Sequence, residues 1–383
     1  MTRISCTIRH CALQENPAVL RQIQTTEQMD TKMPVRPDHQ RPLVIQVAAE
    51  RVKEGRPRSI QIYAEAIRTR LEAQEVRLLD TPYEETRMLP EADVVWAPGL
   101  GNRRVPRSLF AAGARGVATV HGLQMIEAGL EIGRLGIRQG ISHYLWRARI
   151  RHDWVQLGPR IGTVVSVSKN LIPRLTGVLK IPADRITVIP HGVSRGYFRE
   201  PSQHGQSQGY ILHVSQYSFA KNIPGLLAAY DKVRDRIGLP LRIVSGGWPG
   251  DPARLPQGVE MTTDLVSHDK VRELMWGARV FLFPSLEESF GLPVLEAMAS
   301  GVPVVTSLGT GAAEVVGAAG LCVDPTDTDA IANALLHLVT DAALHRRLAH
   351  AGYERAKGFD WDITTDLHLA LFQRLAGRQP APV

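Results

Sequence analysis

Two acidic residues and the turn between them carry the clearest chemistry in this sequence. Glu288 and Glu296 stand eight positions apart within FLFPSLEESFGLPVLEAMASGVPVV, residues 281–305. Pro293 follows a glycine turn and opens an apolar run. Because proline is favoured at the first helical position, this pattern predicts a helix that begins near Pro293. Glu288 then precedes the helix, and Glu296 lies in its first turn.

The loop ahead of this helix is suited to an anion. An apolar run at Val280–Pro284 predicts a strand that leads into a loop at Ser289–Leu292. The free amides of Phe290, Gly291 and Leu292 would converge at the amino end of the helix, which favours a group such as a phosphate. With an acid on each side, this segment predicts a site for a ligand that is phosphorylated and rich in hydroxyl groups.

The string ESFGLPVLEAMASGVPVV resembles the E-x7-E signature of retaining glycosyltransferases of family 4, which have the two-domain GT-B fold. The similarity extends over roughly residues 41–376. The resemblance implies that Glu288 meets the transferred sugar and that Glu296 meets the ribose of a nucleotide-diphosphate sugar. The alternative for the residues themselves is an amphipathic helix with a solvated Glu296 and a loop Glu288.

A cation is predicted beside these acids. Lys221 lies in the loop SQYSFAKNIPG, which follows a predicted strand and precedes a predicted helix start. The family resembled has an arginine and a lysine in this loop that grip the diphosphate. Lys221 matches the lysine, whereas Gln216 stands where many members have the arginine, so one formal charge is missing. A solvated loop lysine is the alternative.

His121 is the residue that we expect the N-terminal half of the chain to place at the donor sugar. It ends the run GVATVHGLQ, which resembles a VTVHD-type motif whose histidine faces the donor sugar, although Gly122 replaces the common aspartate. A histidine with only a structural role is the alternative. Val266 falls where the family contacts the base, and the loop EGRPRS corresponds to an acceptor-side loop. The acceptor-side candidates in this loop are Gly55, Arg56 and Arg58. For the two arginines, a solvated position with no ligand is an equal alternative.

These interpretations define one predicted site. The predicted catalytic residues are Glu288, Lys221 and His121. The predicted donor-binding residues are Gln216, Lys221, Val266, Glu288, Ser289, Phe290, Gly291, Leu292 and Glu296. The resemblance implies a hexose of the mannose or glucose type, transferred with retention to a hydroxyl of a glycan or a lipid-linked saccharide. It implies neither a cofactor nor a metal.

Short apolar runs alternate with helical stretches along most of the chain, which predicts an α/β protein with parallel sheets. We expect two doubly wound, Rossmann-like domains that face a cleft, with a terminal helix at about Ile363–Leu375 that crosses back. The predicted divisions are an N-terminal extension (1–40), an acceptor-side domain (41–198), a linker (199–209), a donor-binding domain (210–358) and the terminal helix region (359–383).

The composition and charge of the chain limit the classes of binding partner that we expect. The 383 residues carry a net charge of +7 that is dispersed along the chain, and no basic stripe with interleaved aromatic residues indicates nucleic acid. The three cysteines lack metal-ligand spacing, and no apolar run approaches the roughly 18 residues of a spanning helix, so we expect a reduced, cytoplasmic protein. Arginines at residues 134–151 accompany Tyr144 and Trp146, which suggests either an interfacial segment at the inner membrane face or a solvated helix.

Two D-x-D strings resemble metal-binding motifs. Asp360-Trp361-Asp362 precedes the terminal helix, and Asp327-Thr328-Asp329 is typical of a turn and helix cap, so no metal site is predicted at either. The rival functions are a phosphorylase or epimerase of the same fold, a silent binding subunit and a dinucleotide-binding oxidoreductase. The last needs a G-x-G-x-x-G turn, which neither Leu43–Glu54 nor Tyr210–Lys221 supplies.

Overall fold

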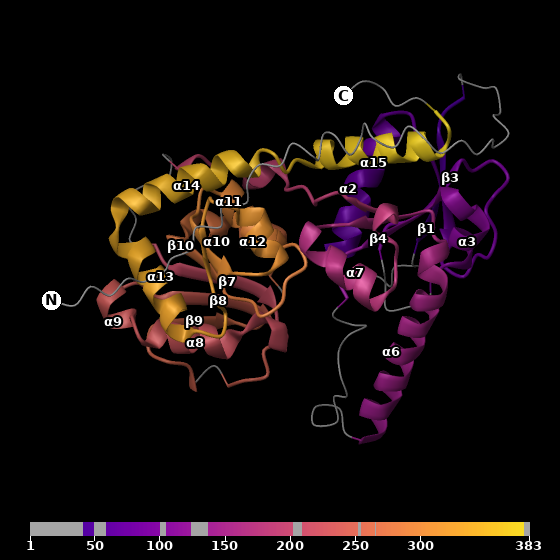
Figure 1. Ribbon diagram of the computed structural model, residues 1–383. Coiled ribbons are helices and arrows are strands. Elements are labelled where there is room, and N and C mark those ends of the chain that lie inside the picture. Colours follow the sequence, from indigo (N-terminus) through magenta and orange to yellow (C-terminus); the bar gives the residue numbers. More distant parts are fainter. Residues whose placement is uncertain are drawn as a thin grey trace.

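Two parallel β-sheets form the centres of two domains (Figure 1). The computed structural model describes residues 41–49, 59–99, 105–123, 137–201, 209–251, 254–264 and 266–378. Within this part of the chain each sheet has six strands, ordered β2-β1-β3-β4-β5-β6 and β12-β11-β10-β7-β8-β9. Every strand pair is parallel. The α/β prediction with two doubly wound sheets is therefore confirmed.

The first domain holds the elements that precede residue 190. Its strands are β1 (Val44–Ala49), β2 (Arg77–Pro82), β3 (Val94–Ala97), β4 (Gly116–Val120), β5 (Thr163–Ser166) and β6 (Ile186–Val188). Its helices are α2 (Ser59–Ala73), α3 (Arg107–Ala112), α6 (Ile137–Leu157) and α7 (Ile172–Val178). Strands such as β3 are buried along their whole length, because helices cover both faces of the sheet.

The second domain repeats this alternation. Its strands are β7 (Ile211–Gln216), β8 (Leu241–Gly246), β9 (Val259–Thr262), β10 (Val280–Phe283), β11 (Val304–Ser307) and β12 (Leu321–Val323). Its helices are α8 (Ile223–Asp231), α9 (Arg234–Ile237), α10 (His268–Gly277), α11 (Leu292–Ala299), α12 (Gly311–Val316), α13 (Thr328–Thr340) and α14 (Ala342–Ala356). Helices α8 and α9 are separate, because the chain leaves helical geometry at Val233, which precedes α9.

The last helix, α15 (Trp361–Leu375), lies along the first domain, as predicted (Figure 1). Trp361 and Phe372 join the apolar core of that domain. Arg70 of α2 pairs with Asp362 at 2.6 Å, and the Tyr63 hydroxyl lies 2.7 Å from His368 Nε2. The helix is therefore fixed to the first domain by both apolar packing and polar contacts.

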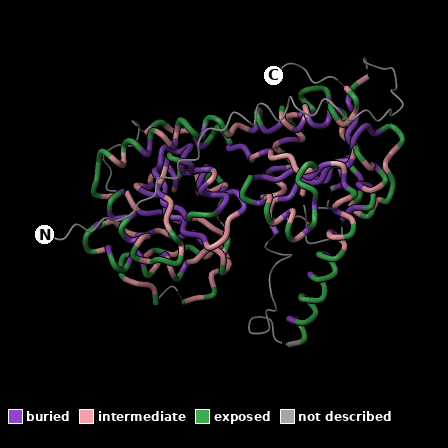
Figure 2. Tube along the Cα trace, in the orientation of Figure 1, coloured by how far each residue is buried: buried purple, intermediate pink, exposed green. Residues whose placement is uncertain are grey.

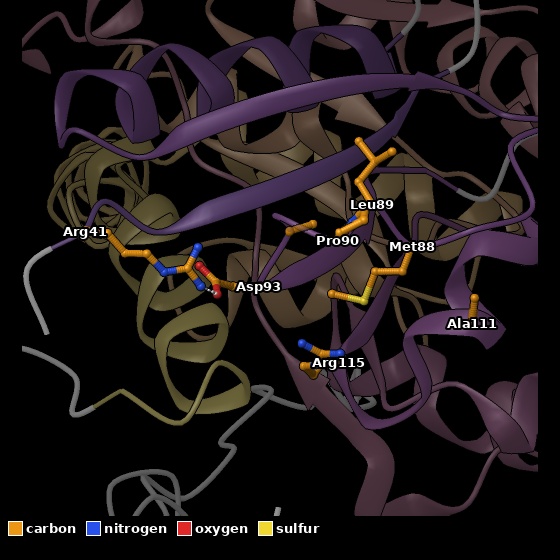
Figure 3. A pocket seen from close by; sticks show the side chains of 8 residues that line it. Arg41, Met88, Leu89, Pro90, Asp93, Ala111 and Arg115 are labelled. Atoms are coloured by element: carbon orange, nitrogen blue, oxygen red, sulfur yellow. Dashed lines mark hydrogen bonds and ion pairs between the residues drawn. The ribbon is translucent and has the colours of Figure 1, made fainter. Parts of the chain in front are cut away.

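A cavity of about 320 Å³ lies at the far edge of the first sheet (Figure 3). It is lined by Arg41, Met88, Leu89, Pro90, Ala92, Asp93, Ala111 and Arg115. Arg41 is paired with Asp93 at 2.5 Å. Because residues 41, 93 and 115 precede β1, β3 and β4, this cavity faces the amino ends of the strands. The predicted site residues follow strands, so they lie at the opposite edge.

Candidate functional site

The loops after β7 and β10 bring the predicted cation and the first acid together. Lys221 ends a short 3-10 helix, η7 (Phe219–Lys221), after β7. Its Nζ lies 2.5 Å from Glu288 Oε2, and the two side chains are only 17% and 15% exposed. The amide of Leu286 also donates to the Ala220 carbonyl at 2.8 Å. Neighbouring strands of one sheet therefore hold two charged groups at the same edge.

This ion pair is positioned to exchange partners. Both groups are largely withdrawn from water, where ionic interactions are stronger than at the surface. Lys221 also lies over the ring of Phe283, with Nζ 5.1 Å from the ring centre. An anionic ligand could take Lys221, which would release Glu288 to accept hydrogen bonds from hydroxyl groups.

The turn between the two acids has the geometry that the sequence predicts. Gly291 adopts φ 102°, in the left-handed region, and caps α11 without help from any side chain. A Cβ at Gly291 would lie 2.9 Å from the Ala312 Cβ, so both the backbone and the space require glycine. Pro293 lies in the first helical turn. The backbone amides at this helix start are therefore open to an anion.

Glu296 faces the protein interior more than the solvent. Burial raises the pKa of its carboxyl to about 7. The phenol of Tyr197 faces this carboxyl and favours its ionised form, although the hydroxyl lies outside ordinary hydrogen-bond geometry. An ionised carboxylate only accepts hydrogen bonds, so the half-buried Glu296 is suited to a ligand that offers two hydroxyl groups, such as a ribose.

Glu296→Gln is expected to stabilise the protein at pH 8 and to change its stability little at pH 5. The folded pKa of about 7 lies above the ordinary value of 4.5, so between these values the folded protein keeps a proton that the unfolded chain loses. The free energy of unfolding therefore falls as the pH rises from about 4.5 to about 7, and a neutral glutamine lacks this term. Urea unfolding at both pH values tests this, and an equal effect at pH 5 and pH 8 would contradict it.

His121 lies at the carboxyl end of β4 with both ring nitrogens engaged. Its Nε2 lies 2.8 Å from the Pro98 carbonyl, and its Nδ1 lies 3.2 Å from His191 Nε2. Burial lowers the pKa of His121 to about 4, so the ring is neutral. Because a carbonyl only accepts, Nε2 carries the proton and Nδ1 accepts from His191. A contact with sugar through this ring would have to replace one of these two bonds.

The first domain reaches the Glu288 loop directly. A Cβ at Gly122 would lie 2.7 Å from Ser289 Oγ, and the rings of His191 and Phe290 are 4.9 Å apart. The loops that follow β4 and β10 therefore meet across the two domains.

The remaining predicted donor-binding residues lie at other positions of the second domain. Gln216 is exposed at the end of β7, where its Nε2 donates to the Gly246 carbonyl at 2.7 Å. Val266 is half-buried just before α10. The acceptor-side candidates Gly55, Arg56 and Arg58 lie outside the described residues.

Tyr197 and His191 belong to the site's surroundings, although the sequence does not single them out for function. Tyr197 ends a short 3-10 helix, η5 (Arg195–Tyr197), that contacts α11. His191 follows β6 and is 4% exposed. The available signal was their position after a strand of the first domain, at the edge where the carboxyl ends of the strands meet.

The D-x-D strings have structural partners. Asp327 accepts from the amides of Asp329 and Ala330 at 2.9 Å each, which is the helix cap that the sequence predicts. Asp360 caps α15, and Asp362 pairs with Arg195 at 2.6 Å. Within the described ranges, no three His, Cys, Asp or Glu side chains are grouped so that they could hold a metal ion.

Residues 208–341 match the family described as Glycosyl transferases group 1. This range covers most of the second domain. The matched range contains Lys221, Glu288 and Glu296. The O-antigen chain mannosyltransferase B of Escherichia coli is 37% identical over 235 residues, which are 56% of this chain and 60% of that protein. The chain therefore matches less than two thirds of the length of this relative.

Two solved structures share the fold. Sucrose-phosphate synthase from Thermosynechococcus elongatus superposes with a TM-score of 0.63 at 18% identity, over 88% of this chain and 100% of that one. HepE from Anabaena, in complex with UDP and glucose, gives a TM-score of 0.60 at 17% identity, over 86% and 99%. The two parallel sheets are arranged as in these proteins, so the GT-B prediction is confirmed.

Proposed function

We propose that this chain is a group 1, family 4-type glycosyltransferase that moves a hexose from a nucleotide-diphosphate sugar to a hydroxyl acceptor, with retention of configuration. The observation that carries the proposal is the 2.5 Å pair of Lys221 and Glu288 beside an uncapped helix start. Such a site offers a cation and amides to a diphosphate, and it offers carboxylates to sugar hydroxyls. The group 1 match and the GT-B fold support the same reading.

The charges of the site suit sugar transfer. As the bond to the diphosphate breaks, the leaving group gains negative charge and the anomeric carbon becomes cationic. Lys221 and the amides of residues 290–292 would stabilise the negative charge on the leaving group. Glu288 would hold donor hydroxyls near the cationic anomeric carbon. We favour attack on the same face as the leaving group, with the leaving phosphate taking the acceptor proton. No metal or cofactor is needed in this scheme.

A mannosyl donor and an acceptor in polysaccharide synthesis are the preferred substrates, because the relative from Escherichia coli is named an O-antigen chain mannosyltransferase. The neighbour HepE is in complex with UDP and glucose, which supports a nucleotide sugar as the donor class.

A thermal-shift screen of nucleotide sugars tests this proposal. A ligand that binds only the folded state raises the melting temperature, and at a hundredfold excess over Kd it adds about 2.7 kcal/mol. We expect a UDP- or GDP-sugar to stabilise the native protein and to stabilise Lys221→Ala much less. Stabilisation by NAD, with no response to any nucleotide sugar, would favour the oxidoreductase instead.

We also propose that α6 contacts an anionic membrane surface where a lipid-linked acceptor would lie. This helix extends from the first domain, and most of its surface is exposed (Figures 1 and 2). Ile141, Tyr144 and Leu145 are 44%, 48% and 61% exposed. Their spacing of three and four residues places them on one face. Among the described residues no helix is both long and apolar enough to cross a bilayer.

Arginines on both sides of this apolar stripe match an anionic surface. Arg138, Arg149 and Arg151 are exposed, and on a helix of 100° per residue they flank the stripe. Arg147 of the same helix does not belong to this surface, because it is only 6% exposed. An apolar stripe bordered by arginines is typical of a helix that lies in a membrane interface.

The double substitution of Arg149 and Arg151 by glutamine is expected to weaken binding to anionic vesicles by about thirtyfold, since each arginine near such a surface contributes about 1 kcal/mol. Flotation with vesicles that contain phosphatidylserine measures this, and Arg236→Gln on α9, also exposed, is the control. Equal flotation of the double variant and the control would contradict the proposal.

A further inference from the structure

One short segment of the first domain holds the loop that carries Glu288. We call residues 168–174, which follow β5, the clamp segment. Ser168 Oγ donates to the Ser289 carbonyl at 2.6 Å. Arg174 forms an ion pair with Glu287. The residues on either side of Glu288 are therefore both bound by the opposite domain.

The clamp segment also binds α12 through a carboxylate. The two oxygens of Glu314 accept from the amides of Lys169 and Asn170, each at 3.0 Å. Asn170 Nδ2 donates to the Gly309 carbonyl at 2.9 Å. Hydrogen bonds to an ionised acceptor are roughly twice as strong as those between neutral groups. Glu314 is therefore the strongest single link between the clamp segment and α12.

Helix α12 in turn rests directly on the Glu288 loop. The amide of Gly311 donates to the Glu288 carbonyl at 2.7 Å. A Cβ at Gly311 would lie 2.0 Å from the Ser289 carbonyl oxygen, so no side chain fits between them. A shift of α12 would therefore move the backbone of Glu288 and Ser289 with it.

We infer that Ser168 and Glu314 are positioning residues that couple contact between the two domains to the placement of Glu288. The inference rests on the proposed function for its meaning in catalysis. Neither residue belongs to the predicted donor site, and both act through the backbone of the loop. When the domains separate, the bonds to Ser289 and Glu314 break together, and the loop keeps only its contacts within the second domain. Glu288 is then held for the sugar only while the domains are in contact.

Hydrogen exchange of the native chain and of two variants tests this coupling without any substrate. Glu314→Gln removes the charge that binds two amides, and Ser168→Ala removes the bond to Ser289. Glu354→Gln is the matched control, because Glu354 is exposed and pairs only with nearby Lys357 at 2.7 Å among the contacts described. We expect amides of residues 286–292 to exchange about tenfold faster in both variants than in the control, as the loss of such a bond predicts.

Turnover supplies a second readout. Misplacement of a reacting group by about 1 Å costs up to about 10²-fold in rate, so both variants should lower kcat and change KM for the donor less. Exchange of residues 286–292 equal to that of the control would overturn the coupling. If the native protein binds no nucleotide sugar, the proposed function fails, while the exchange result still decides the coupling. Should Glu314→Gln fail to fold, the milder Ser168→Ala decides alone.

Discussion

Lys221→Ala is expected to lower kcat by about 10²–10³-fold while the protein remains folded. Removal of one fixed group that stabilises developing negative charge has this effect in other enzymes. Lys221 is the cation 2.5 Å from Glu288, and Gln216 leaves the site without the second cation that the resembled family commonly has. The sequence therefore predicts no second cation in this loop that could replace the charge of Lys221.

Steady-state kinetics with the donor found by thermal shift measure this effect. Lys232→Ala is a suitable control, because Lys232 is 41% exposed and pairs with Asp329 away from the site. Lys221→Arg should recover part of the activity, since it keeps the charge but not the shape. Unchanged kcat/KM in Lys221→Ala would remove this residue from the mechanism.

Glu288→Gln is expected to lower kcat by about 10²-fold or more, with a smaller change in donor affinity. The substitution keeps the size of the side chain but removes the negative charge beside the forming cation. It also leaves Lys221, which is only 17% exposed, without its carboxylate partner. In the native protein this pair must separate before the donor can occupy both groups.

A double-mutant cycle separates these effects. Because Lys221 and Glu288 are in direct contact, the double variant should lose much less activity than the product of the two single losses. Calorimetry with the donor would show whether affinity is retained. Glu273→Gln on α10, where Glu273 forms an exposed pair with Lys270, is the control for loss of an acid. Full activity of Glu288→Gln would exclude an essential role for its charge.

Much of the fold could be predicted from local patterns. The strand predicted at Val280–Pro284 is β10, and the terminal helix predicted at about Ile363–Leu375 is α15, because buried strands and amphipathic helices have strong periodicity. The edge strand β2, with the sequence RLLDTP, was not predicted. Only one of its six residues is buried, so it lacks the apolar run that marks a strand covered on both faces.

Strand β9, at one edge of the second sheet, was also not predicted. Its sequence VEMT alternates between half-buried and exposed residues and is too short to show a period. Helix α14 was also not predicted. Asp341 is both the C-cap of α13 and the N-cap of α14, so no loop separates the two helices in the sequence.

The site was predictable where residues lie close in sequence. The turn at Gly291 and the helix start at Pro293 follow from local backbone preferences. The contact of Lys221 with Glu288 joins residues 67 positions apart, and the resemblance supplied it where local patterns could not. The bond between His121 and His191 joins two distant loops of the first domain, and the contacts of the clamp segment depend on how the two domains meet. No local pattern encodes either feature.

A crystal structure of the protein with the nucleotide sugar that stabilises it most would test the central claim directly. The account predicts that the diphosphate lies against the amides of Phe290, Gly291 and Leu292, and that Lys221 Nζ has moved from Glu288 to a phosphate oxygen. It predicts that Glu296 accepts from the ribose hydroxyls. A nucleotide bound elsewhere, with the Lys221–Glu288 pair intact, would contradict it.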